Sequence, residues 1–261
     1  MRKHFAAIFA TVFVFLFAGR NIAKAFLLHD LPFKVITREE WGARPQNAED
    51  PLHYCYNYLN HREHFGITET EGDEEMLRKI YADRRIIIHH TGVSQGRGPL
   101  GEQMAQMDEL GWFDIAYHLY ITPDGKIHEG RNLFIMGTQT GNPGHHDRNC
   151  ARRKSFILSE DWDFRNIGIA LEGDYQENPN IPEPQLKSLE ELVSVLRDRL
   201  RISKVNWHKQ FSRSRDCPGR YLIPKIKAMF PDYDKVSPYV SGSRKLNKDT
   251  PKYRCNCRSG K

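Results

Sequence analysis

Beyond its N-terminal end, the chain has no apolar segment long enough to cross a membrane. The one long apolar run, residues 5–18, covers about 14 residues, whereas a membrane-spanning helix needs roughly 20. The sequence also has no internal repeat, and no run of basic residues interleaved with aromatic ones. These absences exclude a repeat architecture and a polytopic membrane protein. We therefore expect no nucleic-acid partner and no stable membrane insertion.

Cysteine is scarce, and its count is odd. The five cysteines are Cys55, Cys150, Cys217, Cys255 and Cys257. If Cys217 is a metal-bound thiolate, the other four are enough for two disulfides, whose connectivity the sequence does not give. Cys255 and Cys257 are separated by one residue and cannot easily pair with each other because of local strain. We hypothesise that the C-terminal tail is bonded to both Cys55 and Cys150.

The N-terminus has the layout of a secretory signal peptide. A basic start precedes the apolar run, and Ala23-Lys24-Ala25 places small residues at the two cleavage positions. We expect cleavage after Ala25 and export to the periplasm or the extracellular space; a retained anchor is the alternative. The remaining 236 or so residues suit one domain. The net charge of +6 favours anionic surfaces, among them cell-wall polymers, nucleic acid and lipid headgroups.

Hydrophobic periodicity predicts alternating strands and helices, and hence an α/β domain built on a central sheet. The predicted strands are 85–89, 113–122, 126–130, 166–172 and 205–208, and the predicted helices are 74–81, 100–110 and 182–200. In the second strand, Ile115, Tyr117, Leu119 and Ile121 alternate and should share one face. The domain is expected to cover residues 26–240, with insertions at about 46–83 and 141–163 and a basic tail at 241–261.

Three residues have side chains that bind zinc: His89, His208 and Cys217. A catalytic zinc ion usually has three protein ligands and one open position for water. His89 ends a predicted buried strand, and the loop between His208 and Cys217 is short enough to bring both to one point. Each residue also has an ordinary structural interpretation: a hydrogen-bonded histidine, a surface histidine or a disulfide cysteine. Likewise, Tyr117 could be a core tyrosine and Arg215 a solvated charge.

Several motifs shift this balance, because together they resemble the type-2 N-acetylmuramoyl-L-alanine amidases, a family that includes the peptidoglycan recognition proteins. The similar stretches occur in the family's order within residues 35–231: residues 40–44, 87–91, 111–118, 124–131 and 166–169, then His208, and finally residues 216–219. The resemblance implies a single domain with a mixed central β-sheet flanked by helices.

The resemblance also implies a function and a site. The function is hydrolysis of the amide between the lactyl group of muramic acid and L-alanine in peptidoglycan, with one zinc ion per chain. By position, the zinc ligands are His89, His208 and Cys217. The catalytic tyrosine falls on Tyr117, and Arg215 takes the place of a polar residue two before the cysteine, where it would stabilise the developing oxyanion.

Two positions depart from the family pattern. Ala170 stands where some members have a glutamate, so proton transfer would depend on Tyr117. Gln139 stands where relatives often have a histidine, and the interval from His208 to Cys217 is one residue longer than in many relatives. Gln139 and the longer interval both predict altered substrate contacts or loop shape. They leave open the alternative that the chain is a non-catalytic module that binds peptidoglycan or muropeptides.

Overall fold

The computed structural model describes residues 31–47, 50–140, 155–212, 215–233 and 254–256. The predicted signal peptide and the residues Cys150 and Cys257 lie outside these ranges. Within them, no helix has both the length and the apolar character needed to cross a bilayer.

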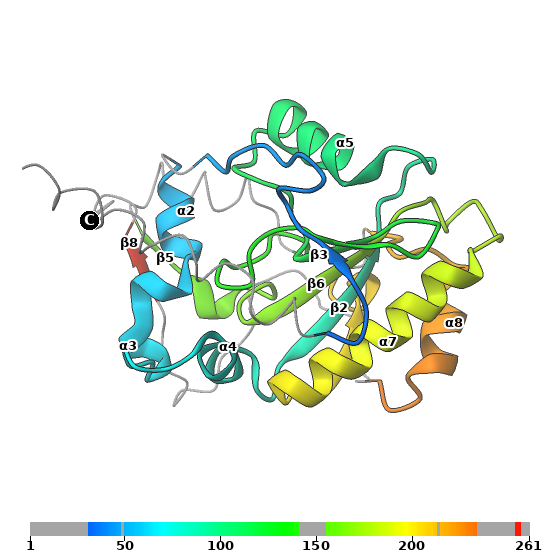
Figure 1. Ribbon diagram of the computed structural model, residues 1–261. Helices are drawn as coiled ribbons and strands as arrows, with labels where there is room; N and C mark the ends of the chain where they lie inside the picture. The colour runs from blue at the N-terminus through cyan, green and yellow to red at the C-terminus, as the bar shows by residue number, and fades with distance from the viewer. Residues whose placement is uncertain (1–30, 48–49, 141–154, 213–214, 234–253, 257–261) are drawn as a thin grey trace, which may run out of the picture.

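A six-stranded mixed sheet forms the centre of the molecule (Figure 1). Its strands are β1 (Val35–Ile36), β2 (Arg85–His90), β3 (Leu119–Ile121), β4 (Ile127–Glu129), β6 (Asn166–Leu171) and β7 (Lys204–Trp207). The spatial order is β1-β4-β3-β6-β2-β7, and only the β3–β4 pair is antiparallel. Every residue of β2 and β6 is buried, as expected for parallel strands covered on both faces. The prediction of a mixed central sheet in a single domain is confirmed.

Helices cover this sheet. They are α2 (Pro51–Tyr56), α3 (Arg62–Phe65), α4 (Asp73–Tyr81), α5 (Gly98–Met104), α7 (Glu183–Leu200) and α8 (Leu222–Met229), with short 3₁₀ turns η1 (Tyr58–His61), η3 (Leu158–Glu160) and η4 (His208–Gln210). The longest helix, α7, runs across the sheet in the view of Figure 1. Its apolar stripe from Leu186 to Leu200 is buried, as the spacing predicts. The predicted insertion at 46–83 supplies α2, α3 and α4.

The two faces of the sheet have different roles. Ile86 and Ile88 of β2 point into the main hydrophobic core together with residues of α4, α7 and α8. Since side chains alternate along a strand, Ile87 and His89 point to the other face. There His89 lies opposite Ala170 of β6. The candidate site is built on this second face.

The predicted strand at 113–122 is wrong over most of its length, because only Leu119–Ile121 is a strand. The buried guanidinium of Arg131 donates hydrogen bonds to the carbonyls of Asp114 (3.0 Å) and Ile115 (2.8 Å). These two carbonyls therefore do not form the hydrogen bonds that would pair residues 114 and 115 with a neighbouring strand. The predicted common face is also wrong: Tyr117 packs with the cluster of Ile115, Tyr120 and Ala170, whereas Leu119 and Ile121 enter the main core.

The predicted helix at 100–110 exists but differs in form and in orientation. After α5 the chain continues as a π-helical turn, η2 (Ala105–Glu109). The predicted apolar stripe is not buried: the exposed fractions of Met104 and Leu110 are 44% and 57%. Instead, the polar side chains Glu102, Gln103 and Gln106 point inward. The segment after this helix offers two polar partners, the carboxylate of Asp114 and the N–H of Ala116. These partners determine which face of the helix is buried.

A second, two-stranded sheet lies apart from the first. Its strands β5 (Ser155–Ile157) and β8 (Arg254–Asn256) pair antiparallel, with Phe156 opposite Cys255. Cys55 in α2 is disulfide-bonded, whereas Cys217 is a free thiol. The hypothesis that the tail is bonded to both Cys55 and Cys150 involves side chains outside the described residues, so the connectivity stays a prediction.

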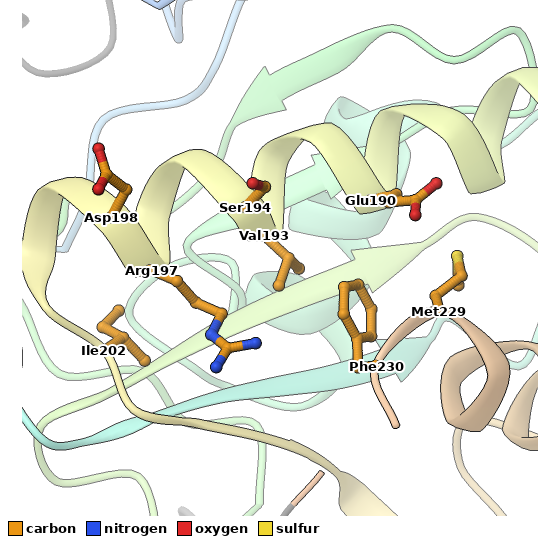
Figure 2. A pocket seen from close by; sticks show the side chains of 8 residues that line it. All are labelled: Glu190, Val193, Ser194, Arg197, Asp198, Ile202, Met229 and Phe230. Carbon is orange, nitrogen blue, oxygen red and sulfur yellow. The ribbon is translucent and has the colours of Figure 1, made fainter. Parts of the chain in front are cut away.

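A groove of about 520 Å³ lies between α7 and the end of α8 (Figure 2). Val193, Ile202 and Phe230 supply its apolar lining, and Arg197 projects into it. None of the candidate site residues lines this groove.

Candidate metal centre

Three side chains distant in sequence converge on the second face of the sheet. The ligand atoms of His89, His208 and Cys217 all lie within 4.8 Å of one another. The Nδ1 atom of His89 is 3.5 Å from the Sγ atom of Cys217, and the imidazole centroids of His89 and His208 are 4.9 Å apart. The topology explains the two histidines: β2 and β7 are parallel neighbours with Ile88 opposite Trp207, so His89 and His208 are the next residues in register.

Cys217 reaches this point through a loop held at two places. The N–H of Lys209 donates to the carbonyl of Cys217 (2.8 Å), which ties the cysteine to the turn that follows His208. Further on, Gly219 has a φ of +97°, and a Cβ atom there would be 2.2 Å from the backbone of Tyr175. Only glycine allows this close approach. In the Asp-Cys-Pro-Gly motif, the glycine thus lets the loop pack closely against Tyr175, and this packing helps to hold Cys217 beside the two histidines.

The electrostatics of the three side chains suit a metal ion. Burial lowers the pKa of His89 well below its usual value, and burial together with Arg215 lowers the pKa of His208 to about 4. Both imidazoles are thus neutral and able to donate a lone pair near pH 7. Burial raises the pKa of the Cys217 thiol to about 12, so a thiolate here requires a cation. The buried Nε2 atom of His89 has no hydrogen-bond partner among the described residues. Two histidines and one cysteine form a donor set that suits zinc.

Tyr117 lies beside this cluster, and its ring centroid is 5.3 Å from that of His89. Burial, followed by the negative charges of Glu102 and Cys217, raises the pKa of the Tyr117 phenol well above 10. The hydroxyl is therefore protonated at neutral pH. Arg215 is exposed at the loop before Cys217, and its charge lowers the pKa of His208, Cys217 and Tyr117. The structure thus brings all five predicted site residues into one region.

His90, the neighbour of His89, does not belong to the cluster. Its Nδ1 accepts a hydrogen bond from the N–H of Tyr175 (3.0 Å). Gln139 is 5% exposed, and both polar atoms of its amide lack partners within the described part of the chain. Its side chain packs against Gly168, which is opposite Ile87 and lies two residue pairs before the pair of Ala170 and His89. The departure at Gln139 therefore lies near the site.

Sequence reasoning missed two polar residues, Glu102 and Gln106, that are hydrogen-bonded to each other and, through Gln106, to the backbone next to Tyr117. Glu102 and Gln106 are buried on the inner face of α5 and η2. Their spacing of four residues places them on one face of a helix and could have indicated a polar buried face. The apolar residues Met104, Met107 and Leu110, also at helical spacing, predicted instead that the opposite face is buried.

The model of the N-acetylmuramoyl-L-alanine amidase family matches residues 79–220, more than half of the chain and all five site residues. The chain belongs to this family. The family resemblance predicted from the sequence motifs is confirmed. The family comprises catalytic amidases and non-catalytic peptidoglycan recognition proteins.

Similar proteins include recognition proteins of insects and mammals. Peptidoglycan-recognition protein SC2 of Drosophila melanogaster is 25% identical over 203 residues, which cover 74% of this chain and 84% of the relative. Peptidoglycan recognition protein 1 of Mus musculus is 40% identical over 150 residues, which cover 55% and 58%. Among solved structures, Drosophila PGRP-LB has 20% identity and a TM-score of 0.53, with 79% of this chain and 99% of that chain covered. At this identity, the structural likeness establishes the fold alone.

Proposed function

We propose that this amidase-family member is an exported, zinc-dependent N-acetylmuramoyl-L-alanine amidase. Its reaction is hydrolysis of the amide between the lactyl group of muramic acid and L-alanine. The observation that supports this proposal most is the convergence of His89, His208 and Cys217 beside the phenol of Tyr117. Binding of peptidoglycan alone needs no such donor set, whereas amide hydrolysis needs an activated water and a polarised carbonyl.

A zinc ion held by His89, His208 and Cys217 would supply a Lewis acid that polarises the scissile carbonyl and lowers the pKa of a water molecule. The protein's own contribution begins with the ligands. Burial keeps both imidazoles neutral, and the N–H of His90 lies 3.4 Å from the Sγ of Cys217, where it offers a hydrogen bond to the sulfur. The neutral imidazoles can each donate a lone pair, and the hydrogen bond from His90 orients the sulfur.

Tyr117 handles the proton in this mechanism. Its phenol is neutral at pH 7, so its O–H donates a hydrogen bond and its oxygen accepts one. It can therefore orient the attacking water and help to move a proton towards the leaving amine of L-alanine. General acid–base assistance of this kind contributes roughly 10²–10⁴-fold to the rate. Because Ala170 offers no carboxylate on this face, the proposed proton transfer falls to Tyr117.

Arg215 supplies the fixed positive charge. Its guanidinium is exposed on the loop that presents Cys217, at a distance where it still lowers the pKa of three site residues. A cation in that place stabilises negative charge as it develops on the carbonyl oxygen during attack.

The substrate and the location follow from the family and the sequence. Several relatives are named as peptidoglycan recognition proteins, and the solved structure of PGRP-LE is described as a complex with tracheal cytotoxin, a monomeric diaminopimelic acid-type peptidoglycan. We propose peptidoglycan or a soluble muropeptide as the partner here. From the predicted signal peptide we also propose that the protein acts in the periplasm or outside the cell.

The second candidate function is recognition of muropeptide without cleavage. The names of the relatives favour it, as does Gln139 in place of the histidine that many relatives carry. A lytic effector that acts on other cells would share the proposed chemistry and differ in its target.

A digest of purified peptidoglycan, analysed by mass spectrometry, separates these functions. Zinc-loaded and chelated protein are compared side by side, and zinc is added back to the chelated sample. Zinc-dependent release of free stem peptides that begin with L-alanine is expected. Binding of muropeptide with no release, by protein shown to contain zinc, would identify a recognition module.

A further inference from the structure

Helix α5 and the following turn η2 bury a polar face. Glu102, Gln103 and Gln106 have exposed fractions of 5%, 0% and 5%, whereas Met104 and Leu110 of the same segment are exposed. Burying a carboxylate and two amides is costly unless each is hydrogen-bonded. Each of these three side chains is hydrogen-bonded. The arrangement is explained by what the buried side chains hold.

These side chains hold the backbone that carries Tyr117. The N–H of Ala116 donates to Oε1 of Gln106 (2.7 Å), and Gln103 donates from Nε2 to a carboxylate oxygen of Asp114 (2.7 Å). On the other side of the segment, the N–H of Arg131 donates to the carbonyl of Tyr117 (2.7 Å). The residue before Tyr117 is therefore held from η2, and Tyr117 itself is held by Arg131, which follows β4.

Glu102 determines the orientation of the Gln106 amide. Since Oε1 of Gln106 accepts from Ala116, its Nε2 must face an acceptor, and that acceptor is Oε1 of Glu102 at 2.7 Å. The other carboxylate oxygen of Glu102 is 3.3 Å from the guanidinium of Arg97. Without an acceptor at position 102, the buried amide of Gln106 would lose its partner and could rotate or flip. The contact to Ala116 depends on Glu102 in this way.

The π-helical turn η2 carries Gln106. It widens the helix at Ala105–Glu109, and the carbonyl of Gln106 also accepts the N–H of Trp112 (3.0 Å). Gln106 is thereby bonded to the 112–116 segment through both its backbone and its side chain. Turns of this type are often found at functional sites.

We propose that Glu102 is a positioning residue for Tyr117, acting through Gln106 and the N–H of Ala116. The ring of Tyr117 packs against Ile115, Tyr120 and Ala170, and no hydrogen bond within the described residues holds its hydroxyl. Its place relative to His89 is therefore set by its backbone. This inference rests on the proposed amidase function, in which the phenol must lie within reach of the reacting groups.

The test compares two substitutions of Glu102. Glu102→Met keeps the length and removes the acceptor, whereas Glu102→Gln keeps an acceptor oxygen for Gln106. We expect kcat to fall roughly 10- to 100-fold in Glu102→Met, with KM within about twofold and zinc content unchanged, because small misplacements of a reacting group have effects of this size. Glu102→Gln should recover most of the loss. Glu109→Met is the matched control, since Glu109 is exposed on the same turn.

A double-mutant cycle with Tyr117→Phe shows whether Glu102 acts through Tyr117. If it does, Glu102→Met causes little further loss of kcat in the Tyr117→Phe background. An equal fold loss in both backgrounds would overturn the inference, because it would mean general damage to the fold.

A readout that does not need activity is amide hydrogen exchange at Ala116 in the zinc-free protein. Exchange should become faster in Glu102→Met and remain slow in Glu102→Gln; unchanged protection in both would also overturn the inference. If Glu102→Met does not fold, Gln106→Met removes the same contact from its other side. Absence of zinc-dependent hydrolysis in the wild type would refute the proposed function, whereas the exchange at Ala116 would still decide the contact.

Discussion

His118 allows a quantitative prediction of how stability depends on pH. Its ring is 1% exposed and hydrogen-bonded at both nitrogens. Nδ1 accepts from the N–H of Gly168 (3.0 Å), so Nε2 carries the hydrogen that is donated to the carbonyl of Ile135 (2.9 Å). A protonated ring would turn a second N–H towards the Gly168 donor. In accord with this, burial lowers the pKa of His118 to about 3.

The direction and the size follow from linkage. The pKa is about 6.5 when the chain is unfolded and about 3 when it is folded, so between these values only the unfolded state binds the proton. The contribution of His118 to stability is complete above pH 6.5 and is lost as the pH falls towards 3. At about 1.4 kcal/mol per pH unit, His118 alone should lower the free energy of unfolding by about 2 kcal/mol between pH 7 and pH 5.

Urea unfolding of the zinc-free protein at pH 7, 6 and 5 measures this loss, with His118→Asn as the comparison. Asparagine can still accept from Gly168 but does not titrate. The variant should be less stable than the wild type at pH 7, since the carbonyl of Ile135 loses its donor, and the difference should shrink by about 2 kcal/mol at pH 5. Parallel pH dependence of the two proteins would refute the reasoning about His118.

Three further substitutions test other parts of the structure. Cys217→Ser should weaken zinc binding and abolish hydrolysis, as measured by metal analysis and the digest assay; full activity in a metal-replete variant would remove Cys217 from the site. Tyr117→Phe should keep zinc but lose about 10²-fold or more in kcat, and an unchanged rate would assign proton transfer to another group. Arg131→Lys should lower the free energy of unfolding by roughly 3 kcal/mol, because one ammonium cannot replace a buried guanidinium that bonds three carbonyls. An unchanged urea midpoint would contradict that role.

The family and the approximate place of the site were predictable from the sequence because they depend on local signals. The run of isoleucines before His89 indicates a buried strand, and His208 follows a second short apolar strand. Parallel pairing of those two strands then brings both histidines to one edge of the sheet. The glycine after Cys217-Pro218 is likewise a local signal, since it marks a close backbone approach. Each of these features can be read within a few residues.

The segment that carries Tyr117 was predicted wrongly because its structure depends on a distant residue. Alternation of apolar residues from Phe113 to Ile121 favours a strand, but Arg131 binds the carbonyls at 114 and 115 and prevents pairing there. The hydrophobic periodicity of residues 113–121 does not reveal that a distant arginine binds the carbonyls of this segment. The inverted face of α5 has the same origin, since Asp114 and the N–H of Ala116 supply the partners that draw Gln103 and Gln106 inward.

The physical cost of burying His89, His208 and Cys217 together supports the proposed metal centre. Burial lowers the pKa of both imidazoles and raises the pKa of the Cys217 thiol, so three polar side chains are buried together here. An unsatisfied buried polar group costs about 1–3 kcal/mol. A module that only captured muropeptide would gain stability by replacing these residues with apolar ones, because none of them would need to ligate a metal ion. Retaining two histidines and a thiol within 4.8 Å of one another, beside a phenol, is explained if a bound cation offsets that cost and takes part in chemistry.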